Sequence, residues 1–139
     1  MGHMVRDFMT KKPITLASSA TVLEAARKMK EGDIGDVLVT KDDKVCGIVT
    51  DRDIVVRTIA DGKDASKVTL DEVCSHELTT ISPDDEISKA VQLMRDKAIR
   101  RLPVCEKGAP VGIVSLGDLA QALDRSSALG AISAQPPNN

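Results

Sequence analysis

Two octapeptides with the same pattern decide the fold. The stretch "GIVTDRDI" occupies residues 47–54, and "GIVSLGDL" occupies residues 112–119. Each has a glycine, an Ile-Val pair, a hydroxyl residue and an aspartate at the same spacing. An apolar run of strand length followed by a hydroxyl residue and an acid predicts a buried strand that ends where a helix begins.

The octapeptides belong to a longer internal repeat. Shifting the sequence by 65 residues aligns residues 5–58 with residues 70–123 without a gap, and nine of the 54 aligned pairs are identical. Other pairs, such as Leu16 with Ile81, keep their apolar character. Self-similarity of this kind indicates one supersecondary unit that occurs twice.

Each copy predicts the element order β-α-β-β-α. The first copy has an extended piece, a helix, two strands and a helix at residues 13–16, 19–32, 36–40, 45–50 and 51–60. The second copy has the same elements at residues 78–81, 82–97, 102–106, 110–115 and 117–124. Short polar segments between the paired strands predict hairpin turns.

Local signals predict where the helices begin and end and which side chains they bury. Thr21 and Glu24 have the spacing of a capping box, Gly32 predicts a C-terminal stop, and Ser82-Pro83 predicts the start of the second long helix. In the closing helices we expect the following side chains to point inward: Ile54, Thr58, Ile59, Leu119, Ala122 and Leu123.

Composition limits the class of protein. Apolar residues make up 42% of the 139 residues, with one Phe and neither Trp nor Tyr, so we expect a packed aliphatic core. The formal charge of −2 and the lack of aromatic stacking platforms argue against a nucleic-acid partner. No apolar run reaches the roughly 20 residues of a membrane span, and Cys46, Cys74 and Cys105 fit neither a zinc motif nor a disulfide framework. We expect free thiols and a cytoplasmic location.

The repeat divides the chain into five parts. We assign residues 1–4 to a tag remainder and natural start, 5–60 to the first repeat, 61–69 to a linker, 70–124 to the second repeat and 125–139 to a flexible tail. The expected fold class is α+β, with α/β-type layers. Because one copy alone buries little apolar surface, we expect the copies to pack about a pseudo-twofold axis with clefts between them.

The tandem βαββα repeat and the G-h-h-[ST]-x-x-D-h signature, where h is apolar, resemble CBS domains, two of which form a Bateman module. The resemblance covers residues 5–123, and we expect a stand-alone pair that forms a homodimer. It implies a regulatory module that binds adenosine-containing ligands such as AMP, ADP or ATP. It also implies that the aspartate near the helix start accepts hydrogen bonds from ribose hydroxyls, and that the preceding Ser or Thr contacts phosphate or ribose.

The chemistry of these residues agrees with that implication. A carboxylate can accept both hydroxyls of a cis-diol, and a helix start presents unpaired N–H groups to a phosphate. The preferred cleft uses the arginine pair of the second copy and comprises Thr10, Thr15, Ile34, Arg100, Arg101, Ile113, Ser115 and Asp118. In the gamma subunits of AMP-activated kinases, which this stretch resembles, basic residues at the matching positions face phosphates.

The first copy has Gly35 and Asp36 where the second has the arginines, and an acid there should repel a polyphosphate. Arg52 could supply compensating charge. This second cleft comprises Ile48, Thr50, Arg52, Asp53, Ser75, Thr80 and Ile99. We expect it to be empty or to hold a less charged ligand.

Several alternatives stay open. Thr50 with Asp53, and Ser115 with Asp118, also have the spacing of simple helix caps, which is compatible with ligand binding. The arginine pair could be solvated surface charge. The module could be a ligand-free scaffold for protein–protein interaction, or could bind S-adenosylmethionine or NAD. We expect neither enzymatic activity, a prosthetic group nor a bound metal, since the sequence lacks nucleophile–histidine, HExxH and P-loop patterns.

Overall fold

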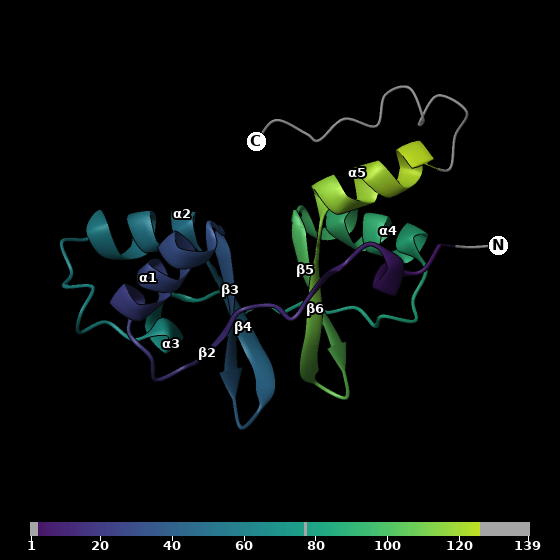
Figure 1. Ribbon diagram of the computed structural model, residues 1–139. Helices are drawn as coiled ribbons and strands as arrows, with labels where there is room; N and C mark the ends of the chain where they lie inside the picture. Colours follow the sequence, from purple (N-terminus) through teal and green to yellow (C-terminus); the bar gives the residue numbers. More distant parts are fainter. Residues whose placement is uncertain (1–2, 77, 126–139) are drawn as a thin grey trace. The chain divides into compact units, whose positions relative to one another are not determined.

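The computed structural model describes residues 3–76 and 78–125, and it divides the chain into two compact units (Figure 1). The N-unit comprises Pro13–Leu78 and Lys107–Pro110. The C-unit comprises the described residues of Met1–Lys12, Thr79–Glu106 and Val111–Asn139. The structure contains helices and two small sheets, and the predicted α+β class is confirmed.

The N-unit is built on a three-stranded sheet in the order β2-β3-β4. Strand β2 is parallel to β3, whereas β3 and β4 form the predicted antiparallel hairpin. Its helices cover one side of this sheet (Figure 1). The elements are β2 (Thr15–Ala17), α1 (Val22–Gly32), β3 (Asp36–Lys41), β4 (Lys44–Thr50), α2 (Asp51–Ile54), the π-helix η2 (Val55–Ile59) and α3 (Leu70–Val73).

The C-unit contains a second three-stranded sheet in the order β1-β6-β5. Its elements are the 3-10 helix η1 (Val5–Asp7), β1 (Thr10–Lys11), α4 (Ile87–Lys97), β5 (Arg101–Glu106), β6 (Ala109–Ser115) and α5 (Leu116–Arg125). The extended piece predicted at 78–81 is reduced to one parallel bridge between Ile81 and Val104. That bridge is the counterpart of the β2–β3 pairing in the N-unit.

The segments before the first predicted strands exchange between the copies. In the C-unit, Thr10 of the first copy pairs with Ile113 of the second. In the N-unit, Ser75 of the second copy pairs with Ile48 of the first. Because Thr10 and Ser75 are 65 residues apart, as are Ile48 and Ile113, the two pairings are the same contact made twice. The compact units therefore differ from the sequence repeats.

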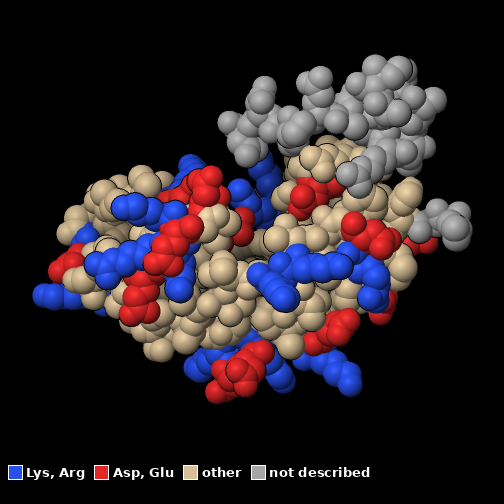
Figure 2. Space-filling view, in the orientation of Figure 1, with Lys and Arg blue, Asp and Glu red and all other residues tan. Residues whose placement is uncertain are grey.

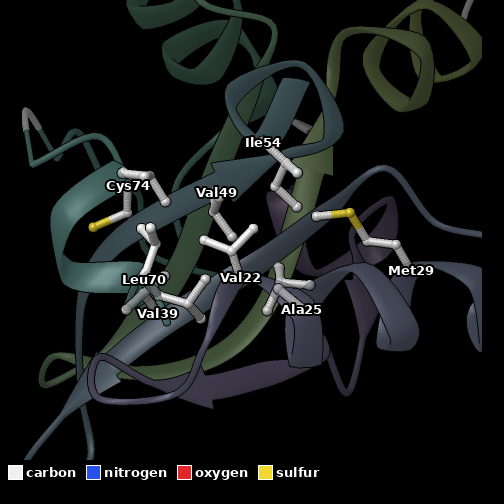
Figure 3. Packing of buried hydrophobic residues seen from close by; sticks show 11 residues of the cluster. Val22, Ala25, Met29, Val39, Val49, Ile54, Leu70 and Cys74 are labelled. Carbon is white, nitrogen blue, oxygen red and sulfur yellow. The ribbon is translucent and has the colours of Figure 1, made fainter. Parts of the chain in front are cut away.

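Exchanged residues also complete the two aliphatic cores. In the N-unit, Leu70 and Cys74 lie among Val22, Val39 and Val49 (Figure 3). In the C-unit, Val5 is fully buried in a cluster that includes Leu102, Val114 and Leu119. Burying a Val or Leu side chain stabilises a fold by about 1.5–3 kcal/mol. Val5 and Leu70 are therefore fully buried anchors of the exchanged segments, and Val73 and Cys74 are buried beside Leu70.

The structure corrects one predicted helix boundary and confirms another. Helix α4 begins at Ile87 with Glu86 as its N-cap, rather than at Ser82-Pro83. Ser82 instead closes a turn, in which its N–H donates to Asp85 Oδ2 at 3.0 Å and its Oγ accepts from the Asp84 N–H at 3.2 Å. The predicted stop at Gly32 is confirmed, because Gly32 is the last residue of α1, and Asp33 after it takes the left-handed conformation, with φ at 51°. Aspartate tolerates that conformation better than most residues.

The closing helix of the first copy differs from its prediction at Ile59. Ile54 and Thr58 are buried as expected, but Ile59 is 62% exposed. The helix widens into a π-turn, in which the Ala60 N–H donates to the Val55 carbonyl at 2.8 Å. The wider turn changes which side chains face the sheet. In α5, Leu119 and Ala122 are fully buried, whereas the side chain of Leu123 and the predicted tail from residue 126 lie outside the described residues.

Candidate functional site

The candidate site in the C-unit forms where β6 ends and α5 begins. The Ser115 N–H donates to Asp118 Oδ2 at 2.9 Å, and the Asp118 N–H donates to Ser115 Oγ at 3.1 Å. These reciprocal bonds form a capping box with aspartate as its acidic member. The box holds the half-buried Asp118 carboxylate at the start of a ten-residue helix, where the helix dipole favours negative charge.

The structure brings four further predicted residues into the same unit. Thr10 pairs with Ile113 on β6, and the Arg100 carbonyl accepts the Leu116 N–H at 2.8 Å, which places the Arg100 backbone beside the start of α5. Arg101 begins β5. We call Thr10, Arg100, Ile113, Ser115 and Asp118 the β6–α5 junction. Thr15 in β2 and Ile34 before β3 belong to the N-unit, and their part in the preferred cleft stays a prediction.

The N-unit contains the corresponding arrangement between β4 and α2. The Thr50 N–H donates to Asp53 Oδ2 at 2.9 Å, and the Asp53 N–H donates to Thr50 Oγ1 at 3.1 Å. Ser75 pairs with Ile48, and Arg52 is exposed in the first turn of α2. We call Ile48, Thr50, Arg52, Asp53 and Ser75 the β4–α2 junction. The other predicted members, Thr80 and Ile99, belong to the C-unit, and their part in the second cleft stays a prediction.

The two junctions differ in charge. The exposed Arg100 stands beside α5, whose first residue is the apolar Leu116. At the corresponding place in the N-unit, the Gly35 carbonyl accepts the Asp51 N–H at 3.0 Å, and a Cβ at Gly35 would lie 3.3 Å from Asp51 Oδ2. The first helical residue is therefore acidic at the β4–α2 junction and apolar at the β6–α5 junction, and the exposed Arg52 adds a positive charge in the first turn of α2. Which junction an anionic ligand prefers stays a prediction.

Arg57 is a residue of the site that the sequence analysis missed. Its Nε lies 4.0 Å from Asp53 Oδ1, and its Nη1 donates to the Val73 carbonyl at 2.9 Å. Two features of the sequence could have indicated Arg57. Asp53 and Arg57 have the i,i+4 spacing of a helical ion pair, and Arg57 aligns with Ala122 in the second copy.

The three cysteines are free thiols. Burial raises the pKa of Cys46 and of Cys105, and it raises the pKa of Cys74 to about 11, with smaller contributions from nearby Cys46 and Asp71. These thiols therefore stay protonated at neutral pH and are poor nucleophiles. Within residues 3–76 and 78–125, no group of three or more His, Cys, Asp and Glu side chains is placed to hold a metal ion.

Surface charge of both signs covers the visible face of the molecule. In Figure 2, lysine and arginine side chains are interspersed with aspartate and glutamate side chains. A nucleic-acid-binding surface usually shows one basic stripe. Within the described residues, no helix is both long enough and apolar enough to cross a membrane.

The repeated junctions on a tandem βαββα framework define a class of regulatory module. The CBS domain model matches residues 5–58 and 70–125, so the chain belongs to the CBS-domain family and contains a tandem pair. CBS domains are generally regulatory and not enzymatic. The chain is 41% identical over 116 residues to the CBS domain-containing protein YhcV of Bacillus subtilis, covering 84% of this chain and 82% of that protein.

Two solved structures show what similar chains can hold. The crystal structure of Hypoxic Response Protein I with two coordinated zinc ions matches with a TM-score of 0.78 and 31% identity, over 86% of this chain and 98% of that one. The CBS domain pair of protein MJ0100, in complex with 5′-methylthioadenosine and S-adenosyl-L-methionine, matches with a TM-score of 0.81 and 25% identity. That match covers 91% of this chain and 100% of the other.

Proposed function

We propose that this CBS pair is a sensor that binds an adenosine-containing ligand, such as AMP, ADP or ATP, at the β6–α5 junction. The observation that carries the proposal is the state of Asp118. One carboxylate oxygen is held by the Ser115 N–H, while no hydrogen bond from a described residue reaches Oδ1. An anchored carboxylate with one open oxygen suits a ribose diol.

The neighbouring residues supply the other contacts that such a ligand needs. Ile113 offers an apolar contact to a purine, and Thr10 lies opposite it on β1. The start of α5 offers the positive end of the helix dipole to a phosphate, and the exposed Arg100, whose carbonyl accepts the Leu116 N–H, adds a positive charge nearby. The MJ0100 complex supports the adenosine moiety as the shared element of the ligand, because both molecules bound there contain it.

Thermal shift and calorimetry of the full chain with AMP, ADP, ATP, S-adenosylmethionine and NAD test this proposal. We expect at least one adenosine ligand to raise Tm, and Asp118→Asn to weaken its binding at least tenfold because the open carboxylate oxygen becomes an amide. Ser88→Ala on the exposed face of α4 is the control and should bind as the wild type does. Binding that is equal in Asp118→Asn and wild type would overturn the assignment.

A protein-interaction module is the second candidate function, and one surface supports it. Val55, Val56 and Ile59, on the closing helix of the first copy, are 52%, 48% and 62% exposed. Adjacent exposed apolar side chains on one helix often mark an interface. We place the expected homodimer contact on this helix. A scaffold without a ligand would keep this contact and show no Tm shift with any nucleotide.

Replacing the apolar side chains of that surface tests the homodimer. Val56→Asp with Ile59→Asp should convert a dimer to a monomer in light scattering, because two carboxylates would be desolvated at the contact. Ile14→Asp, also at an exposed apolar position of the N-unit, is the control. A dimer that persists in the double variant would contradict this placement.

Three further proposals concern catalysis, cellular location and a prosthetic group. We propose that the protein acts by binding and not by catalysis, and hydrolysis of a bound nucleotide would contradict this. The free, protonated thiols are compatible with a reducing cytoplasm. We propose that the regulatory ligand is exchangeable and that no prosthetic group is held.

A further inference from the structure

Asp53 and Asp118 occupy the same position in the two repeats and have the same capping geometry. Their second carboxylate oxygens, however, have different surroundings. Asp53 Oδ1 faces the Arg57 guanidinium, with Nε at 4.0 Å. At Asp118, no hydrogen bond or ion pair from a described residue reaches Oδ1. We propose that Arg57 masks Asp53 and thereby restricts ribose binding to the β6–α5 junction. This inference rests on the proposed function and assigns its specificity to one residue.

Arg57 is held in its masking position by a second anchor. Its Nη1 donates to the Val73 carbonyl at 2.9 Å, at the end of α3. The chain then continues through Cys74 to Ser75, which pairs with Ile48 on β4. The guanidinium is therefore tied both to the carboxylate and to the exchanged segment beside it. A ligand that binds Asp53 Oδ1 would have to displace a guanidinium that the Val73 carbonyl holds in place.

Burial makes the masking contact effective. The Asp53 side chain is only 20% exposed, whereas that of Arg57 is 50% exposed. A partly buried carboxylate gains more from a cationic partner than from neutral hydroxyl groups, because water screens the charges less. Ribose hydroxyls are neutral donors and would replace a charged partner at Asp53. At Asp118 they would replace only water.

The asymmetry is encoded at a single position of the repeat. Arg57 aligns with Ala122, which is fully buried in the C-unit core. A methyl group cannot reach the carboxylate one turn earlier, so α5 offers Asp118 no masking partner at that position. A second difference also disfavours an anionic ligand at the β4–α2 junction. Asp51 lies there, whereas the aligned residue at the β6–α5 junction is the apolar Leu116.

Arg57 has one competing role, in which it contacts the phosphate of a ligand bound at the β4–α2 junction. The two roles predict opposite results when the guanidinium is removed. Loss of a phosphate contact would weaken binding, whereas loss of a mask would create a binding site. The number of ligands bound by each chain therefore separates the two roles.

Calorimetry of the full chain with AMP, ADP, ATP and S-adenosylmethionine measures that number. We expect one equivalent per chain for the wild type and two for Arg57→Ala. We also expect that Asp118→Asn weakens the wild-type site at least tenfold, that adding Arg57→Ala supplies one equivalent with the wild-type affinity, and that further adding Asp53→Asn removes it. Arg27→Ala, which removes the same charge from exposed α1, should stay at one equivalent.

Arg57→Gln is a second variant, which controls for a loss of folding in Arg57→Ala. The glutamine removes the cation, but its amide can still donate to the Val73 carbonyl. One equivalent in both folded variants, or two in the wild type, would overturn the masking role and leave the proposed function intact. Weaker binding in Arg57→Ala and in Arg57→Gln would assign Arg57 to the ligand instead. A wild type that binds none of the four ligands would overturn the proposed function together with this inference.

Discussion

At the residue scale, Gly47 and Gly112 allow the exchanged segments to lie close against β4 and β6. A Cβ at Gly47 would lie 2.7 Å from Cys74 Sγ and 2.8 Å from the Ser75 carbonyl oxygen. A Cβ at Gly112 would lie 2.6 Å from Met9 Sδ and 2.9 Å from the Thr10 carbonyl oxygen. The first glycine of each octapeptide is therefore required by a close approach of backbone.

Alanine at either glycine should destabilise the fold. We expect Gly47→Ala and Gly112→Ala each to lower the free energy of unfolding by about 2 kcal/mol, because a methyl group must displace backbone in a packed region. Gly32→Ala is the matched control, since its nearest neighbours are side-chain atoms of Ile34 at 3.6 Å or more. Urea unfolding followed by circular dichroism measures all three, and equal stability of the three variants would contradict the close-approach argument.

At the element scale, the two closing helices differ although they come from the same repeat. Helix α5 is α-helical from Leu116 to Arg125, whereas α2 continues into the π-helix η2. Thr58 lies in η2, is fully buried, and its hydroxyl has no hydrogen-bond partner among the residues that the structure describes. The aligned residue of the second copy is Leu123. The polar group is therefore peculiar to the first copy and costs stability there.

Removing that hydroxyl should stabilise the protein. We expect Thr58→Val to raise the free energy of unfolding by about 1 kcal/mol, because the shape is kept and an unpaired buried hydroxyl is lost. Thr21→Val is the matched control. It should lower stability by about 1 kcal/mol, because Thr21 Oγ1 accepts the Glu24 N–H at 3.2 Å as the N-cap of α1. Chemical denaturation of both variants checks the opposite signs, and a less stable Thr58→Val would show that the hydroxyl has a partner.

At the scale of the whole molecule, the exchange of segments means that each copy completes the core of the other. Val5, from the first copy, is buried beside strands and helices of the second. Leu70, from the second copy, is buried among residues of the first. Backbone hydrogen bonds also hold the exchanged segments: the Val5 N–H donates to the Asp85 carbonyl and the Leu70 N–H to the Ala20 carbonyl, both at 2.9 Å. Burial of the apolar anchors adds to the stability that these bonds supply.

Truncating Val5 or Leu70 should destabilise the core of the other copy. We expect Val5→Ala to lower hydrogen-exchange protection in β5 and β6, and Leu70→Ala to lower it in β3 and β4, because each truncation leaves a cavity in that core. Leu70→Ala should cost about 3 kcal/mol and Val5→Ala about 2 kcal/mol. Ile14→Ala, at a 40% exposed position, is the control. Lost protection confined to β3 and β4 in Val5→Ala would contradict the exchange.

The sequence alone determined what depends on neighbours within about ten residues. Periodicity predicted α1 and both hairpins, and the spacing of Thr50 with Asp53 and of Ser115 with Asp118 predicted two helix N-caps. These features could be predicted because their partners lie three or four residues away, or directly across a short turn. The repeat also showed that each feature should occur twice, and composition correctly predicted an aliphatic core.

Only the tertiary structure decided which copy each short segment joins. Two such contacts join residues far apart in the sequence: Thr10 pairs with Ile113, and Arg57 donates to the Val73 carbonyl. In addition, an altered helical turn buries Thr58 and leaves Ile59 exposed. Segments of two to four residues have too little periodicity to reveal their partners, because long-range burial decides the pairing. The octapeptides predicted two junctions of the same kind, and the residues before them predicted a difference in charge, but the contact of Arg57 with the Val73 carbonyl was decided only by the packing.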